Sequence, residues 1–408
     1  MLKFELKKVF SRPGSAIAMG ILAVVIGVTC WFATDVYYVD PNGVKQRGPS
    51  AVAALREEQK AWAGELDSEK LRQVILANKE IKSSPEYQSE DENEREIAYS
   101  RGQGFKDIRD LLNHAFAAGF CDYDYYCADR LSGDMASQFY GRRVSLLKEW
   151  LEGEAKEQYT DKEKAFFISR YEKIKTPFYY DYMTGWTRLF DYAPTVVMIT
   201  LLILGYLVSG IFSGEFSWKS DAVFFTSFHG RKRATAAKTG AGLCLVTGIY
   251  LVTMLIYTAI VLLYLGADGW ACPIQILFSG WKSFYNISVW QEYLLILAGG
   301  YIGCLFTSFL CMWVSAKTRS AVIAVMIPFV LIFIPSFLEN IPAPFVGKIL
   351  GLLPDQLLQM GNVLGYFNIY SLGGTLMDAA PILLTVYAVL AVLLVPWTYR
   401  IYRHMEIG

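Results

Sequence analysis

The sequence has few charged residues and very little histidine. Only 19% of its 408 residues are charged and 54% are hydrophobic, and its three histidines are far apart at His114, His229 and His404. A soluble chain of this length needs more charge to cover its surface, so the balance favours a bilayer as the main solvent. Scattered histidines also argue against a metal site.

Motifs for phosphate binding and hydrolysis are missing as well. The chain contains no GxxxxGK[ST] loop, no HExxH and no GxSxG, the spacings that would place phosphate-binding amides, zinc ligands or an activated serine. We therefore expect a non-catalytic protein that has no catalytic residues and holds no cofactor or metal of its own.

Six apolar runs are each long enough to cross a hydrocarbon core, which takes roughly 20 helical residues. They cover residues 14–34, 193–212, 239–265, 293–315, 321–338 and 382–399. The fifth is short and contains Pro328 and Pro335. The pattern predicts an all-α polytopic membrane protein with about six transmembrane helices. The middles of these runs carry essentially no ionisable side chains, which disfavours an ion-coupled carrier.

Basic residues predict the orientation of these spans, because short loops rich in Lys and Arg stay in the cytoplasm. They flank alternate ends of the spans, at Lys3, Lys7, Lys8, Arg12, Lys219, Arg231, Lys232, Arg233, Lys238, Lys317, Arg319, Arg400 and Arg403. We therefore expect both termini in the cytoplasm, an amphipathic helix over 1–12, a first span over 13–34, and five further spans within 192–408. Net charge is zero, so nucleic acid is not an expected partner.

Residues 35–191 hold most of the acidic side chains and are predicted to form a mostly helical extracellular domain. The tract at 50–81 is rich in helix formers, breaks at Gly64 and restarts at Asp67 or Ser68, either of which could cap a second helix. Cys121 and Cys127 bracket a polar stretch in this domain. An exported pair of this kind either forms a disulfide or remains as two free thiols.

The loop over 213–238 is unusually apolar for a solvated connection. Ser220 or Asp221 could cap a short helix over 222–228, and the apolar side chains of that helix exceed what a solvated loop exposes. They are Val223, Phe224, Phe225 and Phe228. The helix either docks on another protein, or its aromatic side chains lie in the headgroup layer or pack under the bundle.

This loop, FSGEFSWKSDAVFFTSFHGRKRATAAK, resembles a segment of the permease subunits of ABC-2 type ABC transporters. The matching positions are Phe212, Glu215, Thr226, Ser227, Gly230, Arg231 and Lys238. The chain departs from the family at Trp218 or Lys219, where a glycine is frequent. The outer segment 341–381, punctuated by Pro and Gly, resembles the family's re-entrant helices, and the large domain after the first span resembles those of permeases from Gram-positive bacteria.

The resemblance implies the membrane subunit of an exporter in the bacterial plasma membrane. ATP and Mg would be bound by partner ATPase subunits, and a second permease, identical or related, would complete the pathway for an amphiphilic, peptide or lipid-like substrate. The expected ATPase-coupling residues are Glu215, Asp221, Val223, Phe224, Phe225, Phe228 and Arg231. The basic run from Arg231 to Arg233 could instead contact membrane lipid or serve only to fix topology.

Two other functions fit the same sequence. A membrane-anchored sensor or immunity protein could bind a peptide or lipid through its extracellular domain without transporting it. A secondary transporter would use an ion gradient, bound through backbone carbonyls and hydroxyls.

Overall fold

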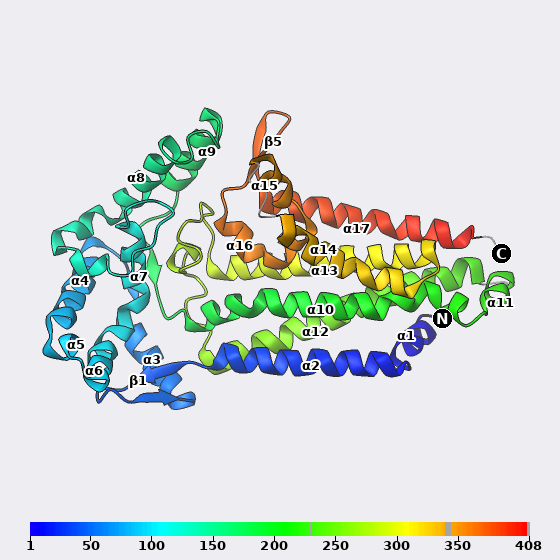
Figure 1. Ribbon diagram of the computed structural model, residues 1–408, viewed down its shortest axis with the longest axis horizontal. Helices are drawn as coiled ribbons and strands as arrows, with labels where there is room; N and C mark the ends of the chain where they lie inside the picture. Colours follow the sequence, from blue (N-terminus) through cyan, green and yellow to red (C-terminus); the bar gives the residue numbers. More distant parts are fainter. Residues whose placement is uncertain (228–229, 339–343, 406–408) are drawn as a thin grey trace.

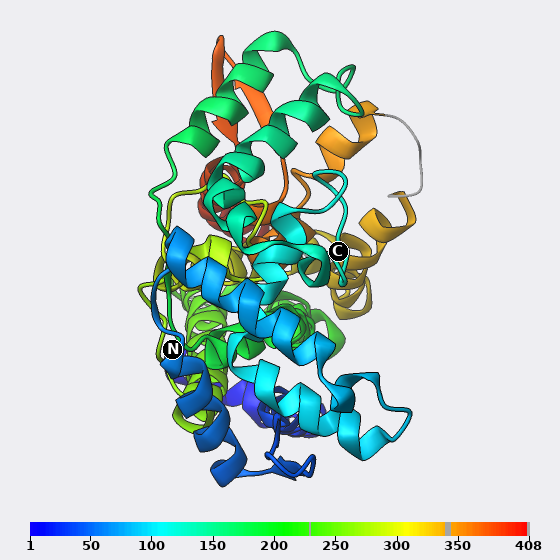
Figure 2. The same cartoon turned by 90° about the vertical axis from the view of Figure 1, so that its left-hand side faces the viewer.

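The chain consists of a long helix bundle with a helical domain at one end. The computed structural model describes residues 1–227, 230–338 and 344–405. Both chain termini lie at the opposite end of the bundle from the helical domain (Figure 1). Figure 2 shows the molecule from the side of the helical domain, whose helices lie in front of the bundle.

The bundle is built from long apolar helices. Their bounds are α2 (Pro13–Thr34), α10 (Thr184–Ser217), α12 (Thr235–Leu265), α13 (Val289–Thr318), α14 (Ala321–Leu338) and α17 (Ala379–Arg403). Local sequence fixes several of their ends. Pro13 begins α2 at the position where a helix tolerates proline, and Ser288 with Gln291 forms a capping box at the start of α13.

Five of these helices are long and apolar enough to cross a membrane, namely α2, α10, α12, α13 and α17. The predicted fifth span corresponds to α14, which has the expected bounds but is shorter than the other five. Large apolar side chains remain exposed on the bundle, such as Leu263 at 87% and Val392 at 69%. Such exposure suits contact with lipid, where an apolar surface needs no cover.

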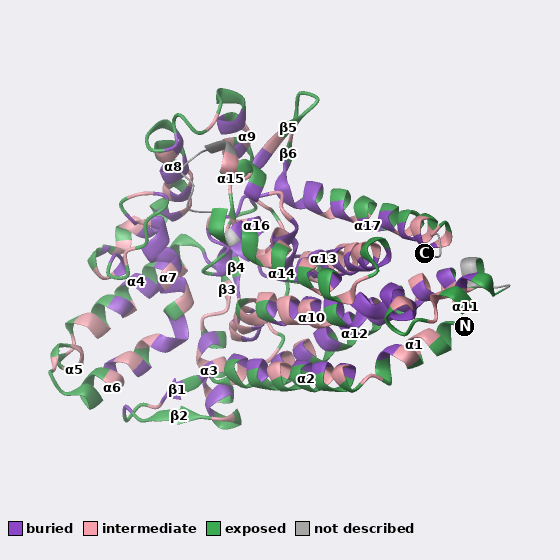
Figure 3. Ribbon diagram, turned by 45° about the vertical axis from the view of Figure 1, so that its right-hand side comes forward, coloured by how far each residue is buried: buried purple, intermediate pink, exposed green. Residues whose placement is uncertain are grey.

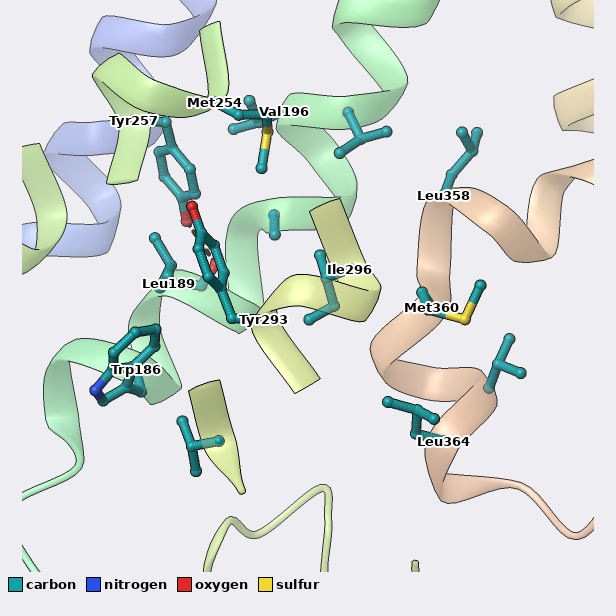
Figure 4. Packing of buried hydrophobic residues seen from close by; sticks show 14 of the residues in the cluster. Trp186, Leu189, Val196, Met254, Tyr257, Tyr293, Ile296, Leu358, Met360 and Leu364 are labelled. Carbon is teal, nitrogen blue, oxygen red and sulfur yellow. Dashed lines mark hydrogen bonds between the residues drawn. The ribbon is translucent and has the colours of Figure 1, made fainter. Parts of the chain in front are cut away.

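Helix α10 begins nine residues before the predicted start of the second span, at Thr184 rather than residue 193. The added turns are held by packing, because Trp186 and Leu189 are buried beside Tyr257 and Tyr293 (Figure 4). The hydroxyl of Tyr257 also donates to the carbonyl of Leu189 at 2.8 Å. These residues therefore extend the core of the bundle beyond the predicted span.

Residues 35–183, here called the helical domain, follow α2. Their helices are α3 (Pro49–Ala61), α4 (Ser68–Ser83), α5 (Pro85–Gln88), α6 (Glu92–Gly102), α7 (Lys106–Ala115), α8 (Phe139–Glu152) and α9 (Asp161–Glu172). The predicted break at Gly64 is present, and Asp67 caps α4 by accepting from the Lys70 amide at 2.8 Å. Two small hairpins were not predicted: β1 (Tyr37–Val39) with β2 (Lys45–Arg47), and β3 (Gly64–Glu65) with β4 (Tyr179–Tyr180).

The chain between α14 and α17 folds over the domain-side end of the bundle. It contains α15 (Pro344–Leu350), the 3-10 helix η6 (Pro354–Gln359), α16 (Met360–Gly365) and a hairpin of β5 (Ile369–Leu372) with β6 (Thr375–Asp378). Gly299 and Gly303 of α13 let this segment approach closely, because a side chain at Gly299 would meet the Leu357 carbonyl at 2.9 Å. The re-entrant character predicted for 341–381 stays a prediction, residues 341–343 lie outside the described residues, and the hairpin was not predicted.

The main core runs along the bundle axis. Buried residues concentrate on the inner faces of α10, α12 and α13, while α2 and α17 keep exposed outer faces (Figure 3). Met254, Ile296 and Leu358 bring α12, α13 and η6 into the same cluster (Figure 4). Burial of this kind fixes the ends of α10 and α12, between which the candidate site lies.

Candidate functional site

Between α10 and α12 lies a short helix, α11 (Asp221–Thr226), at the end of the bundle that also holds both termini (Figure 1). Lys219 makes the turn into it with a φ of 54°, in the left-handed region where glycine is favoured. Lys219 is one of the two positions, with Trp218, at which the sequence was expected to depart from a glycine frequent in the ABC-2 family. The backbone thus makes a left-handed turn at Lys219 with a non-glycine residue.

The predicted coupling residues divide into a packed set and an exposed set. Phe225 is buried against Phe216 and Tyr402, with ring centroids 6.0 and 5.1 Å away, and half-buried Phe224 lies 5.8 Å from Tyr402. Val223 instead is 74% exposed. Packing under the bundle, one of the two interpretations of this helix, therefore holds for the two phenylalanines, and a docking surface on α11 has to be built around Val223.

The other predicted coupling residues are Asp221, Phe228 and Arg231. Asp221 is the first residue of α11 and is half-buried. Ser220 occupies the N-cap position, but its hydroxyl donates to the Glu215 carbonyl at 3.3 Å and accepts no capping bond from the helix. The helix ends at Thr226, two residues before its predicted end. Phe228 lies outside the described residues. Arg231 falls in a short π-helical turn, Gly230–Ala234, in which its side chain is not described.

Glu215 lies at the centre of a buried charge cluster beside α11. Both of its carboxylate oxygens accept from the Lys238 ammonium at 2.8 Å, Lys8 donates to Oε1 at 2.8 Å, and the Tyr402 hydroxyl donates to Oε2 at 3.2 Å. Glu5 approaches Lys238 at 3.3 Å. The cluster contains two carboxylates and two ammonium groups, so its formal charge is zero.

This cluster joins four elements: α1 (Leu2–Phe10), α10, α12 and α17. Lys238 is 1% exposed and Glu215 is 3% exposed. A charge buried this deeply is stable only when it is paired and hydrogen-bonded. The helices on both sides of α11 are therefore fixed to each other and to the two terminal helices.

Trp218 covers the solvent side of the cluster. Its ring lies 5.8 Å from the Lys8 ammonium and 5.5 Å from the Arg12 guanidinium, both within the range of cation–π attraction. Arg12 also donates to the Gly210 carbonyl at 3.1 Å. These contacts hold the start of α2 against the end of α10.

Sequence reasoning identified Glu215 but missed most of its partners. Lys238 was noted only as a basic flanking residue and as a family position, and Glu5, Lys8 and Tyr402 were not proposed as site residues. The one local signal is the i, i+3 spacing of Glu5 and Lys8 in α1, which form a pair at 3.5 Å. Nothing local links Tyr402, 187 residues away, to Glu215.

The two domain cysteines are free thiols in this structure. The Cys127 thiol is buried and donates to the Phe116 carbonyl at 3.0 Å, whereas Cys121 is exposed. Burial raises the pKa of both thiols, which reduces the thiolate fraction that starts disulfide exchange. A disulfide between them stays a prediction, to be tested by alkylation and mass spectrometry.

No cluster of three or more His, Cys, Asp or Glu side chains suited to a metal occurs within 1–227, 230–338 and 344–405. Comparisons with protein-family models, curated proteins and solved structures gave no match to this chain. The class of this protein therefore has to be taken from its helices and their arrangement. It is a multi-pass, essentially all-α membrane protein with a helical domain at one end of the bundle.

Proposed function

We propose that this chain is the membrane-spanning permease subunit of an ABC exporter. The proposal takes α14 as a sixth span and places both termini and α11 in the cytoplasm, with the helical domain outside the cell in a bacterial plasma membrane. ATP and Mg are bound by separate ATPase subunits, and a second permease, identical or related, completes the pathway.

One observation carries this proposal: α11 presents an exposed apolar residue while its base is fixed to the spans. Val223 is 74% exposed, and on the other side Phe224 and Phe225 pack on Tyr402 of α17. Glu215 and Lys238, just before and after α11, bind each other and both terminal helices. Displacement of α11 by a partner would move α10, α12 and α17 together, which is what coupling to an ATPase requires.

The basic side chains at this end support the orientation. Lys3 and Lys7 lie in α1 at the N-terminus, and Lys232 lies in the turn after α11. An excess of such residues in short loops marks the cytoplasmic side. The helical domain would then face the outside, where it contacts or caps the pathway for an amphiphilic, peptide or lipid-like substrate.

A double substitution on the exposed face of α11 tests the proposal. Ala222→Asp with Val223→Asp places two charges on exposed positions in the first turn, where acidic residues favour a helix. We expect the wild-type chain, purified from its native host in mild detergent, to carry a stoichiometric ATPase, and the double variant to lose it. Substitution of Phe224 and Phe225 would be a poorer test, because it would disrupt the bundle.

Val44→Asp is the matched control, since Val44 is 54% exposed in the loop between β1 and β2 of the helical domain. It should keep the ATPase. Retention of the ATPase by the α11 double variant, at wild-type expression and melting temperature, would refute the coupling surface. A wild-type chain that purifies alone in every detergent would refute the exporter and favour the sensor or the secondary transporter.

A further inference from the structure

A cavity of about 770 Å³ lies between the helical domain and the segment that connects α14 to α17. Its aromatic wall comes from both sides and from the loop before α13, and consists of Phe120, Trp150, Tyr159, Phe278, Tyr366 and Phe367. The volume is in the range of cavities that enclose small organic ligands, and a mostly apolar lining with a few polar groups is typical of them. We call it the larger cavity.

A smaller cavity of about 200 Å³ adjoins it, among α10, α13 and α16. Ser279, Gly361 and Asn362 line both spaces, so the two cavities meet at these residues. A side-chain carbon at Gly361 would be in van der Waals contact with Ile296 at 3.5 Å and with the Glu292 carboxylate at 3.6 Å, so a larger residue at this position would fill the junction. Figure 4 shows Ile296 of α13 beside Met360 of α16, the residue before Gly361.

Glu292 lines the smaller cavity and carries a buried, unsatisfied carboxylate oxygen. It is 4% exposed, and its Oε2 has no hydrogen-bond partner among the described residues. A buried carboxylate without a partner is costly, and ionisable groups in spanning helices are usually functional. A cationic group bound beside Glu292 would supply the missing partner.

The other charges orient such a ligand. Lys282 lines only the larger cavity, where its ammonium donates to the Cys121 carbonyl at 3.2 Å. Burial, with a smaller contribution from Lys282, lowers the pKa of His114 to about 4, so this second basic side chain of the larger cavity is neutral at pH 7. Asp191 adds a second carboxylate to the smaller cavity. A cation is therefore favoured at Glu292 and disfavoured near Lys282.

We propose that the two joined cavities bind a cationic amphiphile. Its ammonium or guanidinium group pairs with Glu292 in the smaller cavity, and its apolar or aromatic body lies against the aromatic wall of the larger one. The amine belongs either to a soluble amphiphile or to a membrane lipid with an ammonium headgroup. As a substrate site this assignment rests on the export function proposed above, whereas binding itself does not require an ATPase.

Isothermal titration calorimetry on the full chain tests the assignment. The chain is placed in nanodiscs of phosphatidylglycerol, whose headgroup carries no amine, and titrated with 2-naphthylmethylamine, 2-naphthylmethanol and 2-naphthoate, which share a ring system and differ in charge. We expect the amine to bind about tenfold or more tightly than the alcohol, as suits a charge-assisted hydrogen bond, and the carboxylate to bind most weakly.

Three variants separate charge, access and general effects. Glu292→Gln should bring the amine to the affinity of the alcohol while leaving alcohol binding unchanged. Gly361→Leu should weaken binding of the amine, because the leucine side chain would close the junction between the two cavities. Glu172→Gln, at an exposed position of α9, should leave all three affinities at wild-type values. Equal affinities of the three probes, no binding by any of them, or an unchanged preference in Glu292→Gln at a normal melting temperature would each overturn the site.

Nanodiscs that contain phosphatidylethanolamine identify the source of the amine. Loss of naphthylmethylamine affinity in them supports the Glu292 site with a lipid ligand, and unchanged affinity supports it with a soluble one. The two sites lie at opposite ends of the bundle. Loss of the ATPase in the α11 variant with intact amine binding would therefore show that the coupling surface and the amine site are independent of each other.

Discussion

Removal of the Glu215 charge should destabilise the bundle strongly. Glu215→Gln keeps the size of the side chain but leaves Lys238, which is 1% exposed, with Glu5 at 3.3 Å as its remaining carboxylate. Removing one partner of a buried ion pair typically lowers the free energy of unfolding by about 3–5 kcal/mol. Because Glu5 compensates in part, we expect a loss near the lower end, about 3 kcal/mol.

The reverse substitution should be milder. Lys238→Met removes the buried ammonium, and Glu215 still accepts from Lys8 at 2.8 Å and from Tyr402 at 3.2 Å. The double variant Glu215→Gln with Lys238→Met leaves neither charge of the pair behind. We expect it to be more stable than the sum of the single losses by about 2 kcal/mol, a coupling within the range for residues in contact.

The assay is unfolding of the purified chain in one detergent, followed by intrinsic fluorescence over a denaturant series. Glu172→Gln is the control, because the Lys148–Glu172 pair has the same 2.8 Å length but both side chains are about half exposed. An exposed pair contributes about 0–1 kcal/mol. Equal losses for Glu215→Gln and Glu172→Gln, or strictly additive single losses in the double variant, would refute the buried-cluster interpretation.

Three further predictions follow from other parts of the molecule. His114 has a pKa of about 4 in the folded chain against about 6.5 when exposed, so the unfolded chain binds the extra proton. Stability should therefore fall by about 3 kcal/mol between pH 6.5 and 4, and His114→Phe should remove much of that slope in melting curves. Phe225→Ala should cost about 3–5 kcal/mol as a buried aromatic truncation, whereas Val223→Ala should change denaturant unfolding by less than about 0.5 kcal/mol. Asp268→Asn should loosen α3 from the loop after α12, since Asp268 binds both Arg56 and Lys60 at 2.6 Å, and amide exchange in α3 should rise at least several-fold while α8 stays unchanged.

Much of the bundle was predictable because its signals are local. A run of apolar residues must form a helix in lipid, where every backbone group needs an internal partner, and the five longest helices lie where such runs are. Helix caps such as Asp67 could be predicted for the same reason, because a capping side chain acts on the residues next to it. The early start of α10 was not readable, since Trp186 and Leu189 become helical core only through packing on α12 and α13.

The candidate site was only partly visible in the sequence. Val223, Phe224 and Phe225 attracted notice as an apolar group in a loop, and a helix was predicted there. Which of them face solvent depends on Tyr402 of α17, whose ring fills the space below α11. The cavity carboxylate Glu292 was missed entirely, because a single glutamate at the start of a span has no sequence signature of burial.

The sequence alone determined the solvent and the class of this protein, because hydrophobic runs and basic flanks act residue by residue along the chain. Tertiary structure decided which charges are paired and which are left alone. Glu215 and Glu292 look alike in the sequence, each a glutamate near the end of an apolar helix. Glu215 is surrounded by two ammonium groups and a hydroxyl brought from α1, α12 and α17, whereas Glu292 faces a cavity. The reason is that only the packing of distant helices determines which groups lie within hydrogen-bonding distance of a carboxylate.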